Sequence, residues 1–260
     1  MSFGRLETQL RSRRMLGVKS LVVYLTGGLG DWIPMVRAAA AAGADAIEVG
    51  IPFSDPVMDG PVIQEASERA LAAGANPASI LDGCARLDAG VPVAVMTYYN
   101  LVDHFGLRRF AATAVSSGVS AAILPDLPLE ESGPWCEVAD AEGIETVLLA
   151  APTGSDERLS RVSARSRGFV YGVGLLGVTG ERATLASSAT EIARRLKAIT
   201  DRPVLVGVGI STPAQAAEAC RVADGVVVGS AVVRRAMETG SAAAVGELVG
   251  EFRAALDADR

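Results

Sequence analysis

The feature that most constrains the fold of this chain is an eightfold recurrence of short apolar runs rich in valine and isoleucine. Each run is continuously apolar rather than alternating, which is typical of strands in a parallel sheet covered by helices. Alanine-rich segments with helical spacing lie between the runs. The runs are LVVYL (21–25), AIEVGI (46–51), VPVAVMTY (91–98), SAAILP (120–125), ETVLLAA (145–151), GFVYGV (168–173), RPVLVGV (202–208) and GVVVG (225–229).

A strand followed by a helix, repeated eight times in 260 residues, predicts an α/β fold of the (β/α)8 TIM-barrel type. An open, doubly wound sheet is the alternative, but eight units suit a closed sheet better. No linker interrupts the pattern, so we expect a single TIM-barrel domain over residues 1–260. We expect residues 2–14 to form an extra N-terminal helix that closes the N-terminal face of the barrel. Residues 230–257 predict one long last helix.

The balance of charge argues against a nucleic-acid partner. The chain carries 24 basic and 30 acidic residues, which gives a net charge of −6 and a pI near 5.0. It has no basic face with interleaved aromatic residues. The densest basic cluster is Arg11, Arg13 and Arg14, which we interpret as a solvated helix face.

Cysteine and histidine content argues against a metal site and points to the cytoplasm. The three cysteines, Cys84, Cys136 and Cys220, are far apart in the sequence, as expected for buried, reduced thiols. His104 is the one histidine, and we expect it to have a structural role at the start of a helix.

The apolar run LVVYL is too short for a signal peptide. No apolar run approaches the ~20 residues that cross a bilayer, so we expect no membrane contact.

An acidic residue interrupts the second apolar run. Glu48 lies in AIEVGI, where an unpaired carboxylate costs several kcal/mol or takes up a proton. The loop that follows contains Asp55 and Asp59 among three prolines, more acids than a connector needs. Glu48 and Asp59 are therefore either a pair placed for proton transfer, or a satisfied core acid beside a proline-rich turn. These residues alone leave both interpretations open.

Two glycine-rich turns follow the seventh and eighth runs, where a barrel often binds phosphate. Glycines let the backbone approach an anion closely, and the N–H groups at a helix start bind it. The sequence GVGIST lacks the third glycine of a dinucleotide-binding motif, so we infer a substrate with one phosphate. The candidate phosphate-binding residues are Gly207, Val208, Gly209, Gly229 and Ser230, with Gly180 in the loop after the sixth run.

These motifs together resemble the tryptophan synthase alpha chain family. The stretch IEVGIPFSDPVMDGPVIQEASERAL (47–71) is similar to the family's signature, including two acids eleven residues apart. The motifs YLTGG, PDLPLEES, GVTG, VGVGIS and GSA stand at corresponding places, so the resemblance covers nearly the whole chain. It implies a carbon–carbon lyase that cleaves indole-3-glycerol phosphate to indole and glyceraldehyde 3-phosphate without a metal or cofactor.

The resemblance also implies roles for individual residues. Glu48, semi-buried and with a raised pKa, would protonate indole C3 and deprotonate the side-chain hydroxyl. Asp59, on a more solvated loop, would stay ionised and bind the indole N–H. Tyr171 would lie beside Glu48. The residues expected to line the indole pocket are Met96, Tyr98, Leu124, Leu127 and Thr179. Asp126 is expected to be a hydrogen-bond anchor or a partner contact rather than a third catalytic acid.

The sequence departs from the family in two loops. The family pattern S-x-x-G-V-T-G, often with an arginine, has Gly174 in place of the serine and no arginine at 175 or 176. In the first loop, T-A-G-D-P is replaced by residues 26–30, TGGLG. We expect an alpha subunit that passes indole to a beta chain carrying pyridoxal phosphate (PLP) in an alpha2beta2 tetramer. A stand-alone indole-releasing lyase and a weakly active barrel that activates a beta-chain partner are the alternatives.

Overall fold

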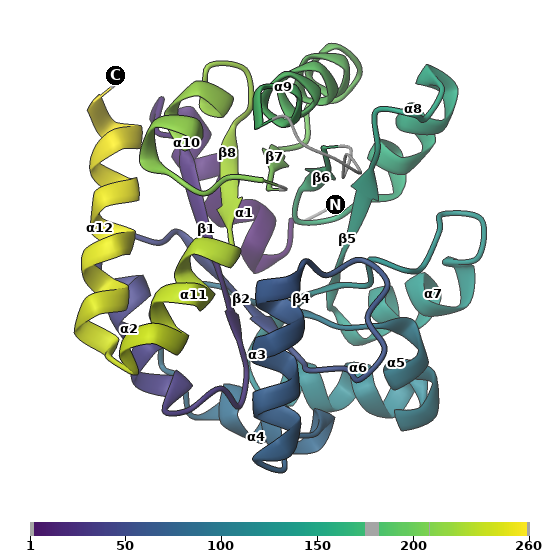
Figure 1. The fold of residues 1–260 in the computed structure, drawn as a ribbon. Helices are drawn as coiled ribbons and strands as arrows, with labels where there is room; N and C mark the ends of the chain where they lie inside the picture. The colour runs from purple at the N-terminus through teal and green to yellow at the C-terminus, as the bar shows by residue number, and fades with distance from the viewer. Residues whose placement is uncertain (1–2, 175–181, 208, 259–260) are drawn as a thin grey trace.

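Eight parallel strands form a closed barrel in the order β1 to β8, which confirms the (β/α)8 prediction. The computed structural model describes residues 3–174, 182–207 and 209–258. Figure 1 shows the helices arranged around the strands. The strands are β1 Ser20–Thr26, β2 Ala46–Gly50, β3 Val93–Met96, β4 Val119–Ile123, β5 Glu145–Ala150, β6 Val170–Gly172, β7 Val204–Val206 and β8 Gly225–Val228.

Each predicted run coincides with one strand, but most strands end before the run does. The first residues beyond the strands, such as Thr97 and Leu124, begin the loops at the C-terminal face. An apolar run reports burial rather than the length of a strand, because Thr97 and Leu124 are buried as well.

Helices cover the outside of the barrel, and one lies at its N-terminal face. They are α1 Arg5–Met15, α2 Trp32–Ala41, α3 Pro61–Ala72, α4 Pro77–Ala85, α5 Tyr99–Phe105, α6 Leu107–Ser116, α7 Gly133–Glu142, α8 Asp156–Arg165, α9 Arg182–Ile199, α10 Pro213–Cys220, α11 Ser230–Thr239 and α12 Ala242–Ala258. In Figure 1, α12 packs beside α2, which joins the end of the chain to its start.

The prediction of one long helix over residues 230–257 is wrong. The helix ends at Thr239 and a second one begins at Ala242. Gly240 has a φ of 60°, and this left-handed conformation stops a helix while suiting a residue without a side chain. Alanine-rich spacing on both sides of the break hides it in the sequence.

Strand residues alternate between the inside of the barrel and the helix-covered outside. Val22, Ala46, Ala94 and Ala121 belong to the interior cluster, whereas their neighbours pack against the helices. Small interior residues leave room for larger ones from other strands, as in the layered cores of such barrels. The same alternation directs Glu48 inward, two residues after Ala46.

Helix α1 closes the N-terminal face, as predicted. Its Leu6 and Leu10 are buried in the interior cluster together with Phe169. The carboxylate of Glu145, at the start of β5, accepts hydrogen bonds from the backbone N–H groups of Leu6 (2.7 Å) and Glu7 (3.0 Å). A strand residue therefore supplies the N-terminal cap that the helix's own sequence lacks.

The basic cluster of α1 is not a solvated face, which corrects the sequence interpretation. Arg11 Nη1 lies 2.8 Å from Asp201 Oδ2, and Arg14 Nη2 lies 3.0 Å from Asp201 Oδ1. Arg13 Nε lies 2.7 Å from Asp45 Oδ1. The arginines tie the helix to the barrel, because their partners come from segments far away in the sequence. Sequence spacing along one helix carries no information about such partners.

All three cysteines are free and buried, as expected. Among the described residues, no group of three or more histidine, cysteine, aspartate or glutamate side chains is arranged to hold a metal ion. A search of the same residues finds no helix long and apolar enough to span a membrane.

Candidate active site

A cavity of about 480 Å³ opens at the C-terminal ends of the strands. This is the end where barrels of this type carry their active sites. It is lined by Tyr24, Glu48, Met58, Asp59, Gly60, Ile63, Met96, Ile123, Pro125, Leu149, Ala151, Tyr171, Val173, Gly174, Gly207, Gly209, Ile210, Ser211, Val227, Gly229 and Ser230.

Glu48 is the charged group at the buried end of this cavity. It lies within β2 and is 1 % exposed. Its Oε2 has no hydrogen-bond partner among the described residues, which is rare for a buried carboxylate oxygen. Burial, and secondarily the charge of Asp59, raises the pKa of Glu48 to about 8. The side chain is therefore available to exchange a proton near neutral pH.

Asp59 approaches from the loop between β2 and α3 and is half-buried. Its backbone carbonyl accepts a hydrogen bond of 2.7 Å from Gln64 Nε2, which fixes the end of the loop to α3. Burial raises the pKa of Asp59, and the neighbouring Tyr98 hydroxyl opposes that rise. The two carboxylates thus occupy environments of different solvation, as the sequence argument expects.

Tyr171 and Tyr24 both lie near Glu48. Tyr171 comes from β6, and burial followed by the charge of Glu48 raises its pKa. Its hydroxyl lies over Gly207, where an added Cβ atom would overlap it. Tyr24, which the sequence argument does not single out, pairs with Glu48 in the register between β1 and β2. Its signal in the sequence is its inward position, two residues after Val22.

The two glycine turns differ in what they offer to a phosphate. Gly207 and Gly209 line the cavity, but the turn leads into α10, whose N-terminus is closed by a capping box between Thr212 and Gln215. Gly229 and Ser230 lead into α11, whose N-terminus has no side-chain cap. The start of α11 therefore borders the cavity, and no side chain of the described residues caps its N–H groups. Gly180 and Val208 lie outside the described residues.

The residues predicted for an indole pocket do not all line the cavity. Met96 lines the cavity from the end of β3. Leu124 and Leu127 are buried in the cluster outside the barrel and do not line the cavity. Strand alternation explains this, because Ile123 and Leu149 point inward and line the cavity instead. The alternation of side chains along each strand is the sequence signal that could have identified Ile123 and Leu149.

Tyr98 lies behind the Asp59 loop rather than on the cavity wall. Its hydroxyl accepts a hydrogen bond of 3.0 Å from the backbone N–H of Met58. Its ring lies 5.1 Å from that of Phe53, at an interplanar angle of 33°. Tyr98 thus contacts the loop at both ends. The fifth predicted pocket residue, Thr179, lies outside the described residues.

Asp126 is the hydrogen-bond anchor that the sequence predicts. Its two carboxylate oxygens lie 2.9 and 3.1 Å from the backbone nitrogen of Tyr99, the first residue of α5. His104 is in the last turn of α5, so its expected place at a helix start is wrong. The helix begins before His104, at Tyr99, whose N–H group is bound by the distant Asp126.

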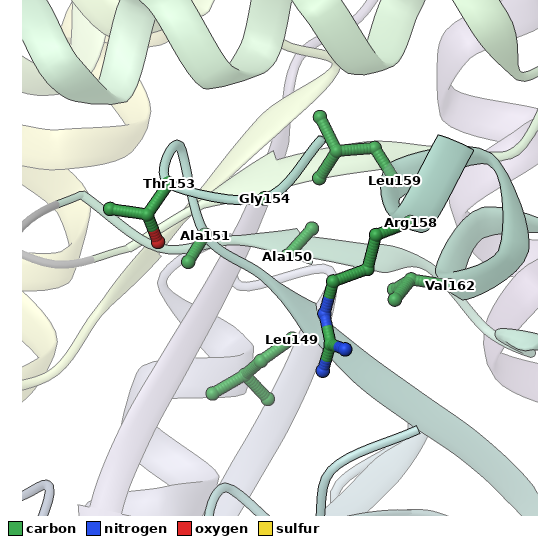
Figure 2. A pocket seen from close by; sticks show the side chains of 8 residues that line it. All are labelled: Leu149, Ala150, Ala151, Thr153, Gly154, Arg158, Leu159 and Val162. Carbon is green, nitrogen blue, oxygen red and sulfur yellow. The ribbon is translucent and has the colours of Figure 1, made fainter. Parts of the chain in front are cut away.

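A second cavity, of about 290 Å³, lies between β5 and α8. Figure 2 shows its side chains, with Arg158 from α8 on one side and Leu149 from β5 on the other. Arg158 is its one charged lining residue and forms an ion pair of 2.6 Å with Glu130. The cavity at the C-terminal ends of the strands, which combines two carboxylates with the start of α11, is therefore the candidate active site.

The arrangement supports proton transfer to a bound apolar molecule that carries a phosphate. Glu48 is able to donate and accept a proton at neutral pH, and Asp59 offers a second carboxylate on the same side. Ile123, Leu149 and Val227 provide apolar walls between the acids and the start of α11.

Comparison with known proteins gives one consistent family. The family model described as "Tryptophan synthase alpha chain" matches residues 12–254. A tryptophan synthase alpha chain from Thermobifida fusca is 43 % identical over 260 residues, covering 97 % of this chain and 96 % of the relative. One from Streptomyces coelicolor is 44 % identical over 238 residues, covering 90 % and 88 %.

Solved structures agree with this result. Tryptophan synthase from Mycobacterium tuberculosis superposes with a TM-score of 0.91 at 37 % identity, covering 98 % of this chain and 99 % of that one. The alpha subunit of tryptophan synthase from Legionella pneumophila superposes with a TM-score of 0.88 at 32 % identity, covering 99 % and 100 %.

Proposed function

The chain belongs to the tryptophan synthase alpha chain family, and we propose that it cleaves indole-3-glycerol phosphate to indole and glyceraldehyde 3-phosphate. As a member of this family it is a lyase of tryptophan biosynthesis. The observation that carries the proposed reaction is the state of Glu48. A buried carboxyl group with an unpaired oxygen and a pKa of about 8 is suited to deliver a proton and recover one in each turnover.

In the proposed reaction, protonated Glu48 donates its proton to indole C3. Asp59 accepts a hydrogen bond from the indole N–H and stabilises the positive charge that develops on the ring. The Glu48 carboxylate then takes the proton of the side-chain hydroxyl. As the bond between indole C3 and the side chain breaks, its electron pair restores the indole ring and the hydroxyl carbon becomes the aldehyde. Glu48 ends protonated, ready for the next cycle.

We assign the phosphate to the start of α11, at Gly229 and Ser230, with Gly207 and Gly209 completing the binding surface. The absence of a side-chain cap at α11 supports this assignment, because its N–H groups are free to bind an anion. Tyr171 would pack against Glu48 and limit the access of water.

We propose that the whole chain acts as one domain in the cytoplasm, as the alpha subunit beside a tryptophan synthase beta chain in an alpha2beta2 tetramer. PLP would belong to the beta chain, and we assign no cofactor to this one. No observation favours a stand-alone lyase or a barrel that only activates a partner.

Turnover of indole-3-glycerol phosphate by the purified protein, alone and with a beta chain, tests the proposal. Glu48→Gln removes the exchangeable proton, so we expect indole release to fall by at least about 10³-fold, and Asp59→Asn by about 10²-fold. Substrate binding, measured by calorimetry, should persist in Glu48→Gln. Indole release by Glu48→Gln at the wild-type rate would contradict the assignment.

A further inference from the structure

The two acids of the site raise a question of proton allocation. This inference rests on the proposed function, in which the reaction needs one proton on Glu48 and none on Asp59. Two carboxyl groups that face one cavity compete for a single proton. We propose that Tyr98 is a positioning residue that donates a hydrogen bond to the Asp59 carboxylate and so keeps the shared proton on Glu48.

The hydrogen-bond geometry of Tyr98 supports this assignment. Its hydroxyl oxygen accepts a hydrogen bond of 3.0 Å from the Met58 N–H, and the backbone of Asp59 faces it from the same loop. The oxygen is thus occupied as an acceptor, which leaves its proton to be donated. The carboxyl group of Asp59, the residue after Met58 in this loop, is the acceptor that we assign to that proton, and the Tyr98 hydroxyl lowers the pKa of this carboxyl group.

The position of the Tyr98 ring is fixed from two sides. The side chain is 3 % exposed and packs against Phe53 of the Asp59 loop. On the other side, Asp126 binds the backbone nitrogen of Tyr99, so the residue after Tyr98 is held at the start of α5. A hydroxyl held in this way makes a hydrogen bond with little loss of side-chain entropy.

Three titratable groups among the described residues face Asp59: Glu48 from β2, Tyr24 from β1 and Tyr98 from the segment after β3. Burial raises the pKa of Tyr98 to about 12, so the phenol remains a donor across the working range of pH. Burial also raises the pKa of Asp59, and among the side chains that the structure describes, that of Tyr98 counteracts this rise. Its contact therefore favours the ionised form of Asp59 over that of Glu48.

Removal of the hydroxyl alone tests the proposal. In Tyr98→Phe the pKa of Asp59 should rise, so the acid limb of the pH profile of kcat/KM should move upward by about one pH unit. Below that limb kcat/KM falls about tenfold relative to the wild type. The matched control is Tyr99→Phe, the same change one residue along, on a side chain that does not line the cavity. The control should keep the wild-type profile.

A structural role alone would give a different result. If Tyr98 only anchors the loop, Tyr98→Phe lowers kcat/KM by the same factor at every pH and leaves the limb in place. That outcome would overturn the proposal. The profile therefore separates proton allocation from loop stability.

A second measurement does not depend on turnover. The titration of the Asp59 carboxyl carbon by ¹³C NMR, assigned with Asp59→Asn, should shift upward in Tyr98→Phe and stay unchanged in Tyr99→Phe. An unchanged titration in Tyr98→Phe overturns the proposal even if the wild type does not cleave the substrate. Failure of the proposed function is recognised separately, as absence of indole release by the wild type.

If Tyr98→Phe does not fold, the same contact is probed from its other end. In otherwise wild-type protein, Asp59→Asn replaces the charged acceptor by a neutral one. The ¹³C resonance of the Tyr98 ring carbon that bears the hydroxyl should then move. An unchanged resonance would show that no hydrogen bond joins the two side chains, and would overturn the proposal.

Discussion

Glu7 and Glu48 are equally buried glutamates at opposite ends of the barrel, each 1 % exposed. Glu7, on α1 at the N-terminal face, lies 2.9 Å from Arg11 Nε and 3.1 Å from Arg202 Nη1. Glu48, at the C-terminal face, forms no ion pair among the described residues and has one oxygen without a partner. The same side chain at the same burial therefore serves two different purposes.

The N-terminal face satisfies its buried acids. Asp224 binds Lys197 at 2.7 Å and accepts a hydrogen bond of 2.9 Å from the backbone N–H of Val204. Glu145 caps α1, as described above. These acids join strand starts to helices that are distant in the sequence. They stabilise closure of the barrel because each charge is matched by a cation or by N–H groups.

At the C-terminal face, the two acids that line the cavity, Glu48 and Asp59, have no cation beside them among the described residues. Burial raises the pKa of Glu48 and of Asp59, and the charge of Asp59 raises that of Glu48 further. An unmatched acid destabilises the folded protein but keeps its proton exchangeable near neutral pH. The difference between the two ends shows where this barrel has given up stability for reactivity.

The largest predicted effect on stability is a gain at the reactive end. The pKa of Glu48 is raised from about 4.5 to about 8, so folding retains a proton that the unfolded chain releases, and stability falls as pH rises through this range. Glu48→Gln removes that loss. We expect the variant to exceed the wild type by about 4 kcal/mol in free energy of unfolding at pH 8.5, measured by urea denaturation. Near pH 4 the two proteins should have equal stability; a constant difference at all pH values would contradict this account.

The same substitution at the other end should have the opposite sign. Glu7→Gln leaves the guanidinium groups of Arg11 and Arg202 without their anion. Removing one partner of a buried ion pair costs several kcal/mol, and the partly exposed arginines reduce this to about 2 kcal/mol. Urea denaturation at pH 7 measures the loss. Indole release per folded molecule should be unchanged, because Glu7 is at the far end of the barrel from the cavity.

The smallest effect is expected for a pair at the N-terminal face that is not buried. Asp201 is 84 % exposed and binds Arg11 at 2.8 Å and Arg14 at 3.0 Å. Solvent screens such pairs, so Asp201→Asn should lower the free energy of unfolding by less than about 1 kcal/mol. Added salt should narrow the difference further. A loss as large as that of Glu7→Gln would show that pairing alone, rather than burial, stabilises this face.

Much of the fold follows from local sequence. The eight apolar runs each coincide with a strand, and Leu6 and Leu10 close the N-terminal face from the predicted first helix. Two features did not follow. The break at Gly240 separates segments of similar composition, and α5 begins early because Asp126 caps it from another loop. Both depend on backbone geometry or on contacts that sequence spacing does not encode.

The site followed from sequence where chemistry is tied to a strand or a turn. Glu48, Asp59, Tyr171, Met96 and the glycine turns all reach the cavity. The apolar walls were less predictable, since Ile123 rather than the adjacent Leu124 points inward. Neighbouring side chains of a strand point in opposite directions, so an error of one residue in position exchanges inward and outward. The apolar pattern does not give strand positions to that precision.

Local sequence is enough to predict that the chain closes a barrel and brings two acids to the same end as two glycine turns, because continuous apolar runs and glycine-rich turns are local properties. Which buried acids find partners became clear from the folded structure. Glu7 pairs with Arg202, which is 195 residues away in the sequence, whereas Glu48 pairs with no cation among the described residues. Whether a buried acid stabilises the fold or remains reactive depends on partners that only folding brings near.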